Sequence, residues 1–225
     1  MAKRNTFVGS LGVKYKPYLP SKFGIMKSII TALDRCKLWC LSIFMVYCIS
    51  CLSGVVMGPS GNQFALNYRD KIVGRAMTND QAAIANNSGN KFKAALLDFG
   101  GNLLIGSTMQ TFLGLGIIIP YLTTAYQGWI GGIVSVDANH QSRLFHARSA
   151  LYYLIVFLLQ TIAYSLCIGS GVRAGVQTYK INKGKRLREY RLHKARYKDV
   201  LLIYVVAIPI FFTASCIEFL TPGLS

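Results

Sequence analysis

An apolar stretch of forty-one residues, 96–136, constrains the fold of this chain more than any other feature. It contains one formal charge, Asp98, and eight glycines. A bilayer core about 30 Å thick is crossed by about 20 helical residues, so this stretch is long enough to enter a membrane and return. Gly128 and Gly132 have the small-xxx-small spacing that lets membrane helices approach closely. We therefore predict a glycine-rich helical hairpin within a membrane.

The distribution of charge supports a membrane protein. The chain is 52% hydrophobic, yet its formal net charge is +17. An even mixture of basic and apolar residues would indicate a nucleic-acid binder, whereas here basic blocks separate apolar blocks. We expect an all-α, multi-span helical integral membrane protein that does not bind nucleic acid. No cleavable signal peptide is expected, because residues 1–37 lack an apolar core of the usual length.

The first 37 residues form a basic N-terminal arm and a predicted amphipathic helix. From Ser21 onward, apolar residues recur at helical spacing, beginning with Phe23 and Met26. Such a helix can lie in the membrane interface, where its lysines and arginines reach anionic headgroups. A cytoplasmic helix packed on the rest of the protein is the alternative.

Residues 38–225 are predicted to form a single transmembrane domain. Between the first two spans, residues 60–93 are polar and indicate a loop with one short helix near Gln81. Pro120 and the polar group from Thr123 to Gly128 favour a turn or a helix break in the middle of the hairpin. The predicted spans are 38–57, 96–119, 121–136, 150–172 and 200–220.

Basic residues determine the predicted topology. Residues 1–37 carry eight lysines and arginines and residues 173–198 carry ten, so both segments are expected in the cytoplasm. The chain must then cross an even number of times between them, and the hairpin must add two crossings or none. With two, five spans result, with the N-terminus inside and the C-terminus outside. We expect the bacterial cytoplasmic membrane.

Two acidic residues, Asp98 and Glu218, lie at the ends of apolar segments near the predicted outer face. Carboxylates within a membrane are costly and are usually paired or functional. The short outer loop, residues 137–149, supplies three possible partners, His140, Arg143 and Arg148. A paired structural carboxylate and a proton or cation site both remain open.

The basic residues beside the spans are expected to contact anionic lipid headgroups. The chain has no HExxH, Walker or GxSxG motif, and its six cysteines do not complete a zinc set. We therefore expect neither an enzyme nor a metal or other cofactor. The residues predicted to contact headgroups are Lys22, Lys27, Lys37, Lys183, Lys185, Arg186 and Arg188.

Several local patterns resemble a known family. Asn102, the run Phe112-Leu113-Gly114-Leu115-Gly116-Ile117, Gln127-Gly128 with Gly131-Gly132, and the C-terminal Ala214-Ser215-Cys216-Ile217-Glu218-Phe219-Leu220-Thr221-Pro222 are similar to the stage II sporulation protein M family. The resemblance implies a five-span membrane scaffold; the namesake works with peptidoglycan-remodelling partners during engulfment. Glu218 and Pro222 match the family's ending and are expected to be structural or partner-binding. The family's Pro-His-Gly-x-x-Glu motif is missing from the comparable residues 158–165.

The leading functional prediction is a non-enzymatic scaffold or accessory subunit that packs against other integral membrane subunits through its hairpin and outer loops. The alternative is a small-solute or ion transporter or channel, in which Asp98, Gln127 and Glu218 contact the solute. An intramembrane enzyme ranks last. The residues predicted to bind partners or to be structural are Glu218, Pro222, Asp98, Asn102, Gln127, Gly128 and Gly132.

Overall fold

The computed structural model describes residues 22–137, 139–184 and 194–221, and these are almost entirely helical. Within these ranges no strand occurs beyond one isolated antiparallel bridge between Val136 and Ser142. The all-α prediction is therefore confirmed. In chain order the elements are α1 Lys22–Met57, α2 Gln63–Asn79, α3 Gln81–Asn87, α4 Lys91–Gly100, the π-helix η1 Gly101–Thr108, α5 Met109–Leu113, the 3-10 helix η2 Gly114–Gly116, α6 Ile119–Ile133, the 3-10 helix η3 Arg143–Phe145, α7 Ala147–Asn182 and α8 Lys194–Leu220.

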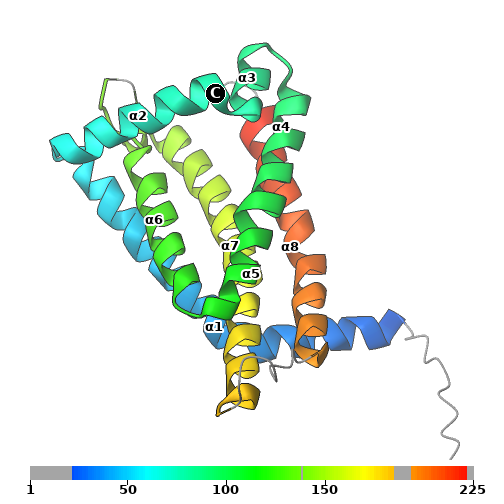
Figure 1. Ribbon diagram of the computed structural model, residues 1–225. Helices are drawn as coiled ribbons and strands as arrows, with labels where there is room; N and C mark the ends of the chain where they lie inside the picture. The colour runs from blue at the N-terminus through cyan, green and yellow to red at the C-terminus, as the bar shows by residue number, and fades with distance from the viewer. Residues whose placement is uncertain (1–21, 138, 185–193, 222–225) are drawn as a thin grey trace, which may run out of the picture.

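Three helices are long and apolar enough to cross a membrane: Gly24–Met57, Ala147–Asn182 and Tyr197–Leu220. Figure 1 shows them side by side with the hairpin formed by α4 to α6, while α2 runs across one end of the bundle. We call the α2 end the outer end and the opposite end the inner end. The helix α7 contributes most of the central core, which includes Ile168 and Val172, and Phe211 of α8 packs on it.

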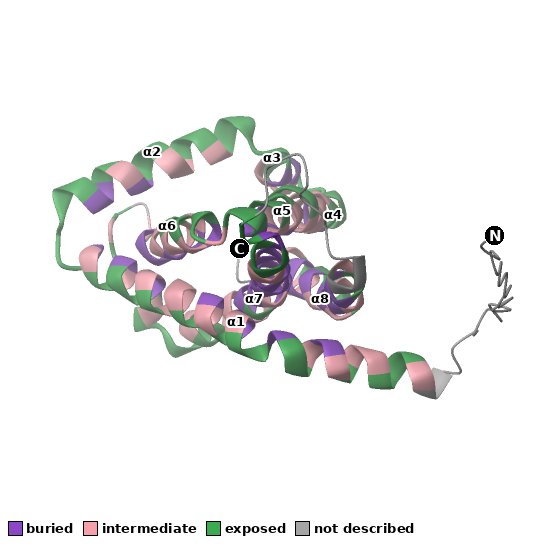
Figure 2. Cartoon of the chain, turned by 60° about the horizontal axis from the view of Figure 1, so that its bottom comes forward, coloured by how far each residue is buried: buried purple, intermediate pink, exposed green. Residues whose placement is uncertain are grey.

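The first helix is longer than predicted. The expected interfacial helix and the expected span 38–57 are one continuous helix of 36 residues. No glycine or proline occurs between Gly24 and Gly54 to interrupt it. Ala32 and Cys36 are buried against Ile203 of α8, so this part of the helix packs partly on the protein itself. Figure 2 shows its N-terminal end projecting beyond the other helices.

The prediction of a mostly irregular loop at residues 60–93 is wrong. This segment holds α2, of 17 residues, as well as α3 near Gln81. Asn62 caps α2 by accepting from the Ala65 amide, and Asp80 caps α3 by accepting from the Ala82 amide. Because α2 lies across the end of the bundle, only a narrow side of it is buried (Figure 2). Its sequence therefore lacks a broad apolar stripe.

The hairpin turns earlier than predicted. Its break falls at residues 114–118, while Thr123 and Gly128 lie within α6. Pro120 occupies the first turn of α6, where its missing N–H has no partner to lose. Ile117 adopts a φ of 53°, a rare conformation for a β-branched residue.

Glycines set the closest helix contacts. A Cβ on Gly128 would stand 2.5 Å from the carbonyl oxygen of Tyr47, and a Cβ on Gly132 would stand 2.1 Å from that of Cys51. On the other side of the hairpin, Gly114 packs against the backbone of Gly171. The glycine face that we predicted for partner subunits is thus occupied by α1 of the same chain.

Candidate functional site

Three helices bring predicted site residues together near the outer end of the bundle. Asp98 and Asn102 are four residues apart where α4 continues into η1, and Glu218 lies near the end of α8. Residues four apart share a helix face, so Asp98 and Asn102 point to the same side of their helix. The structure thus unites Asp98, Asn102 and Glu218, which are distant in sequence. The helix α7 contributes Gln160 and Tyr164 to the same region.

The Asp98 carboxylate is held by hydrogen bonds from two elements. Its Oδ2 accepts from the Ser215 hydroxyl at 2.6 Å and from the Asn102 amide at 2.9 Å. The Asn102 side-chain oxygen in turn accepts from the Tyr164 hydroxyl at 2.5 Å. Polar groups inside a bundle are stable when they satisfy one another in this way. Asp98 therefore links α4 to α8, and Asn102 links η1 to α7.

Glu218 is in a different situation. Its Oε2 accepts from the Gln160 amide at 2.8 Å, and its backbone carbonyl accepts from the Tyr152 hydroxyl at 2.6 Å. No other hydrogen bond to its carboxylate comes from the residues that the structure describes. Gln160 and Glu218 both line a cavity of about 440 Å³. The carboxylate therefore remains accessible to a molecule in that cavity.

The cavity is lined by side chains from most of the bundle. Aromatic residues of α1 and α7 form much of its wall, Val73 of α2 and Asn86 of α3 contribute from the outer end, and Arg143 of η3 is the cation in the lining. A second cavity of about 720 Å³, between η3 and the start of α7, shares Arg143, Tyr152 and Tyr153 with the first. The shared residues place the two cavities next to each other. The aromatic lining residues are Tyr47, Tyr152, Tyr153, Phe157 and Phe219.

The predicted partners of Asp98 are wrong. His140 contacts Asp70 of α2 instead, with 3.1 Å between its Nε2 and the Asp70 Oδ2. Arg143 lines the Glu218 cavity, and Arg148 lies exposed in the first turn of α7. The reason for the difference is that Ser215 of α8 and Asn102 of η1 supply neutral hydrogen-bond donors to Asp98, so its carboxylate does not require a cation as partner.

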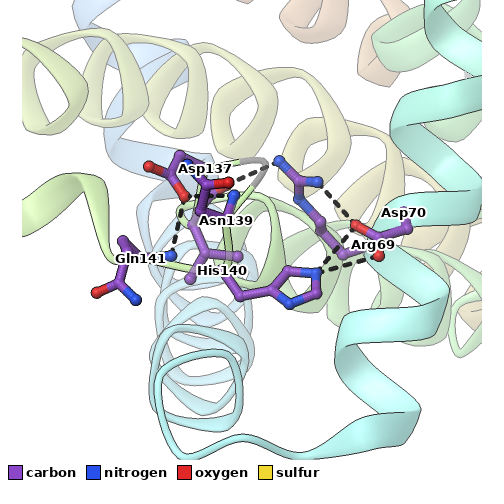
Figure 3. Close-up of polar contacts among 7 residues, drawn as sticks. Arg69, Asp70, Asp137, Asn139, His140 and Gln141 are labelled. Carbon is purple, nitrogen blue, oxygen red and sulfur yellow. Dashed lines mark hydrogen bonds and ion pairs between the residues drawn. The ribbon is translucent and has the colours of Figure 1, made fainter.

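Figure 3 shows the polar contacts that close the outer end. The buried Arg69 of α2 donates to the Asp70 carboxylate at 2.8 Å and to the Val136 carbonyl at 3.1 Å. Hydrogen bonds from Arg69 and His140 hold the pKa of Asp70 below its ordinary value. The backbone amides of Gln141 and Asn139 lower the pKa of Asp137 in the same way. These contacts fasten α2 to the outer loop and so fix one side of the cavity.

Gln127, another predicted site residue, lies elsewhere. Its side-chain oxygen accepts from the Gln110 amide at 2.7 Å, and Gln110 accepts from Thr123 at 3.2 Å. These bonds join the two arms of the hairpin. Gln127 does not line either of the two cavities near Glu218.

The inner end contains a buried ion pair that sequence reasoning missed. Arg173 of α7 donates to Asp199 of α8 at 2.7 Å, and both side chains are 8% exposed. Arg35 of α1 approaches the same carboxylate at 3.5 Å. Basic residues beside the spans were expected to contact headgroups, and only the packing of three helices makes Arg173, Asp199 and Arg35 partners.

The residues predicted to contact lipid headgroups are only partly described. Lys27 and Lys37 are exposed on α1, and Lys183 is exposed directly after α7. Lys22 begins α1. Lys185, Arg186, Arg188 and Pro222 lie outside the described residues.

Neither family models, nor curated proteins, nor solved structures contain a match to this chain. The resemblance to the stage II sporulation protein M family stays a prediction. In the described ranges no group of three His, Cys, Asp or Glu side chains is arranged to hold a metal ion.

Sequence reasoning also missed most of the cavity wall. Gln160 was detectable, because it is the only amide or charged residue between positions 150 and 172. A polar residue inside a span is a functional signal by itself. The tyrosines gave no such signal, since aromatic residues are common at any membrane interface.

Proposed function

We propose that this chain is an integral membrane protein that crosses the membrane five times and binds a small charged solute or ion from the outer side, as a transporter does. Glu218 carries the proposal: it lines a cavity, and its carboxylate has one described hydrogen-bond partner, Gln160. A carboxylate within a membrane is costly unless it has a function or a charged partner. The Oδ2 of Asp98 already accepts hydrogen bonds from both Ser215 and Asn102, and we assign Asp98 a supporting role.

The five crossings rest on the direction of the helices and on the charges at their ends. Besides the three long apolar helices, the hairpin contributes a descending arm, α4 to α5, and an ascending arm, α6 (Figure 1). The N-terminal part of α1, which carries Lys27 and Lys37, and the end of α7, which Lys183 follows, lie at the inner end (Figure 1). By the positive-inside rule, we expect these lysines beside anionic headgroups. These charges support a topology with the N-terminus in the cytoplasm and the outer loop outside.

The topology is tested with single reporter cysteines in a chain whose native cysteines are replaced by serine or alanine. An impermeant maleimide added to intact cells should label Gln141→Cys in the outer loop. Lys183→Cys should be labelled only after the cells are opened. Labelling of both positions from the same side would contradict the five crossings.

The binding function is tested by the thermal unfolding midpoint of the purified protein with a panel of inorganic cations, ammonium compounds and zwitterions. A ligand of the cavity should raise the midpoint of the wild type and should lose this effect in Glu218→Gln. Asp34→Asn, which alters an exposed carboxylate of α1 far from the cavity, should respond like the wild type. If the whole panel has no effect, or if Glu218→Gln responds fully, the proposal fails. Compounds that bind are then followed by flux into lipid vesicles.

A second candidate function is assembly with other integral membrane subunits. Gly128 and Gly132 are used within the chain, but Gly100 and Gly101 have open space where a Cβ would stand. A partner helix could approach closely there. Gentle extraction and mass spectrometry of comigrating chains test this idea. Loss of a reproducible partner on Gly100→Leu, but not on Gly74→Leu in α2, would support it; migration of the wild type alone would refute it.

A further inference from the structure

The cavity beside Glu218 contains charges of both signs. Glu218 extends into it from α8, and Arg143 lines it from the outer loop. Arg143 forms no salt bridge with any carboxylate in the described part of the chain, and its side chain is exposed. The two charges come from different elements and are not paired with each other. The cavity therefore offers one anionic and one cationic contact to a single ligand.

Aromatic rings line the same cavity as Glu218. Tyr47 of α1 and Phe157 of α7 have ring centroids 5.7 Å apart, and Tyr153 stacks on Phe157 at 6.4 Å. The faces of aromatic rings attract alkylated ammonium groups, and a nearby carboxylate adds to this attraction. Water competes poorly for such a group in an apolar wall, whereas it competes strongly for a small inorganic ion. The wall thus favours an organic ammonium group over a bare metal cation.

We propose that the ligand is a small zwitterion whose ammonium group lies among the aromatic rings beside Glu218 and whose anionic group faces Arg143. This inference rests on the proposed solute-binding function and names its ligand class. An organic cation without an anionic group would leave Arg143 unpaired in the same cavity, and an anion would meet Glu218. A volume of about 440 Å³ lies within the range of about 300–1,000 Å³ that is typical of small-molecule sites.

The inference is tested with three matched probes on the full-length protein in detergent. Glycine betaine carries both charges, choline carries the same trimethylammonium group without an anionic group, and acetate carries only the carboxylate. We expect glycine betaine to bind at least about tenfold more tightly than choline, because it engages Arg143 as well, and acetate to bind weakest. Affinity is measured from the concentration dependence of the thermal unfolding midpoint and by calorimetry.

Paired variants separate the two contacts. Arg143→Gln should reduce the affinity for glycine betaine to that for choline and leave choline binding unchanged or stronger. Tyr153→Leu should weaken both compounds, because it removes a ring face. Arg148→Gln is the control, since it removes an exposed arginine five residues away that lines neither cavity. Midpoints without ligand show whether each variant is still folded, and Phe157→Leu replaces Tyr153→Leu if that variant is not.

The outcomes distinguish this inference from the proposed function. Equal binding of choline and glycine betaine, with no effect of Arg143→Gln, overturns the zwitterion but leaves a solute site at Glu218. If only an inorganic cation stabilises the protein, and if this effect depends on Glu218, the zwitterion is likewise overturned and the solute site at Glu218 stands. No stabilisation by any compound overturns both proposals.

Discussion

The crossing of α1 and α6 offers a sharp test of the fold, because neighbouring glycines there have opposite surroundings. A Cβ on Gly132 would stand 2.1 Å from the Cys51 carbonyl oxygen and 2.8 Å from the Gly54 Cα, both backbone atoms. The first of these distances is about 1.3 Å short of the 3.4 Å at which ordinary van der Waals contact begins. Because backbone atoms cannot rotate away as a side chain can, the two helices must separate.

The expected cost of Gly132→Ala follows from two opposing effects. Forcing an extra carbon into a packed interface costs about 1–3 kcal/mol, and a clash with backbone atoms belongs at the upper end. Alanine is also a better helix former than glycine by about 1 kcal/mol, which offsets part of that cost. We expect Gly132→Ala to lower the free energy of unfolding by about 2 kcal/mol.

Gly131→Ala is the matched control. The same helix gains the same methyl group one residue away, and the nearest atom is the Tyr47 hydroxyl oxygen at 3.8 Å. We expect no loss of stability, and a gain of up to about 1 kcal/mol from helix propensity. The measurement is reversible unfolding in mixed micelles with increasing denaturing detergent. Equal effects of the two substitutions would refute the assigned contact between α1 and α6.

Two further predictions concern charged groups. Asp199→Asn should lower the free energy of unfolding by about 3 kcal/mol, because it leaves Arg173 buried without an anionic partner. The double variant Arg173→Met with Asp199→Leu should recover most of that loss. The same unfolding assay checks both values, and a double variant no more stable than Asp199→Asn would contradict this prediction. The pKa of Asp70 is lowered from 3.8 by its hydrogen bonds, so its contribution to stability is complete above pH 3.8 and is lost as the pH falls through the lower value of the folded state. The unfolding midpoint of the wild type should therefore fall more steeply than that of Asp70→Asn below about pH 4, and parallel curves would show that the Asp70 contacts do not matter.

Sequence composition alone predicts the helical class and the apolar spans. Long apolar runs, free of charge, leave helices as the economical way to satisfy backbone hydrogen bonds in lipid. It also identified Asp98 and Glu218, because charged side chains are conspicuous in an apolar background. Asn102 was identified through the family resemblance. Three of the predicted spans coincide with the long apolar helices α1, α7 and α8. Local composition is therefore sufficient to predict apolar spans and the charged residues within them.

Which of these residues meet depends on how the helices pack. Asp98 pairs with Ser215 rather than with a cation, and Arg173 pairs with Asp199, because helix packing brings together residues 117 and 26 positions apart. Gly128 and Gly132 of the hairpin face α1 instead of a partner subunit. Their spacing in the sequence shows that they share one helix face, but it does not show which helix packs on that face. The cavity itself arises where α1, α7, α8 and the outer segments fail to fill the space between them. Its chemistry therefore depends on side chains that no local pattern connects.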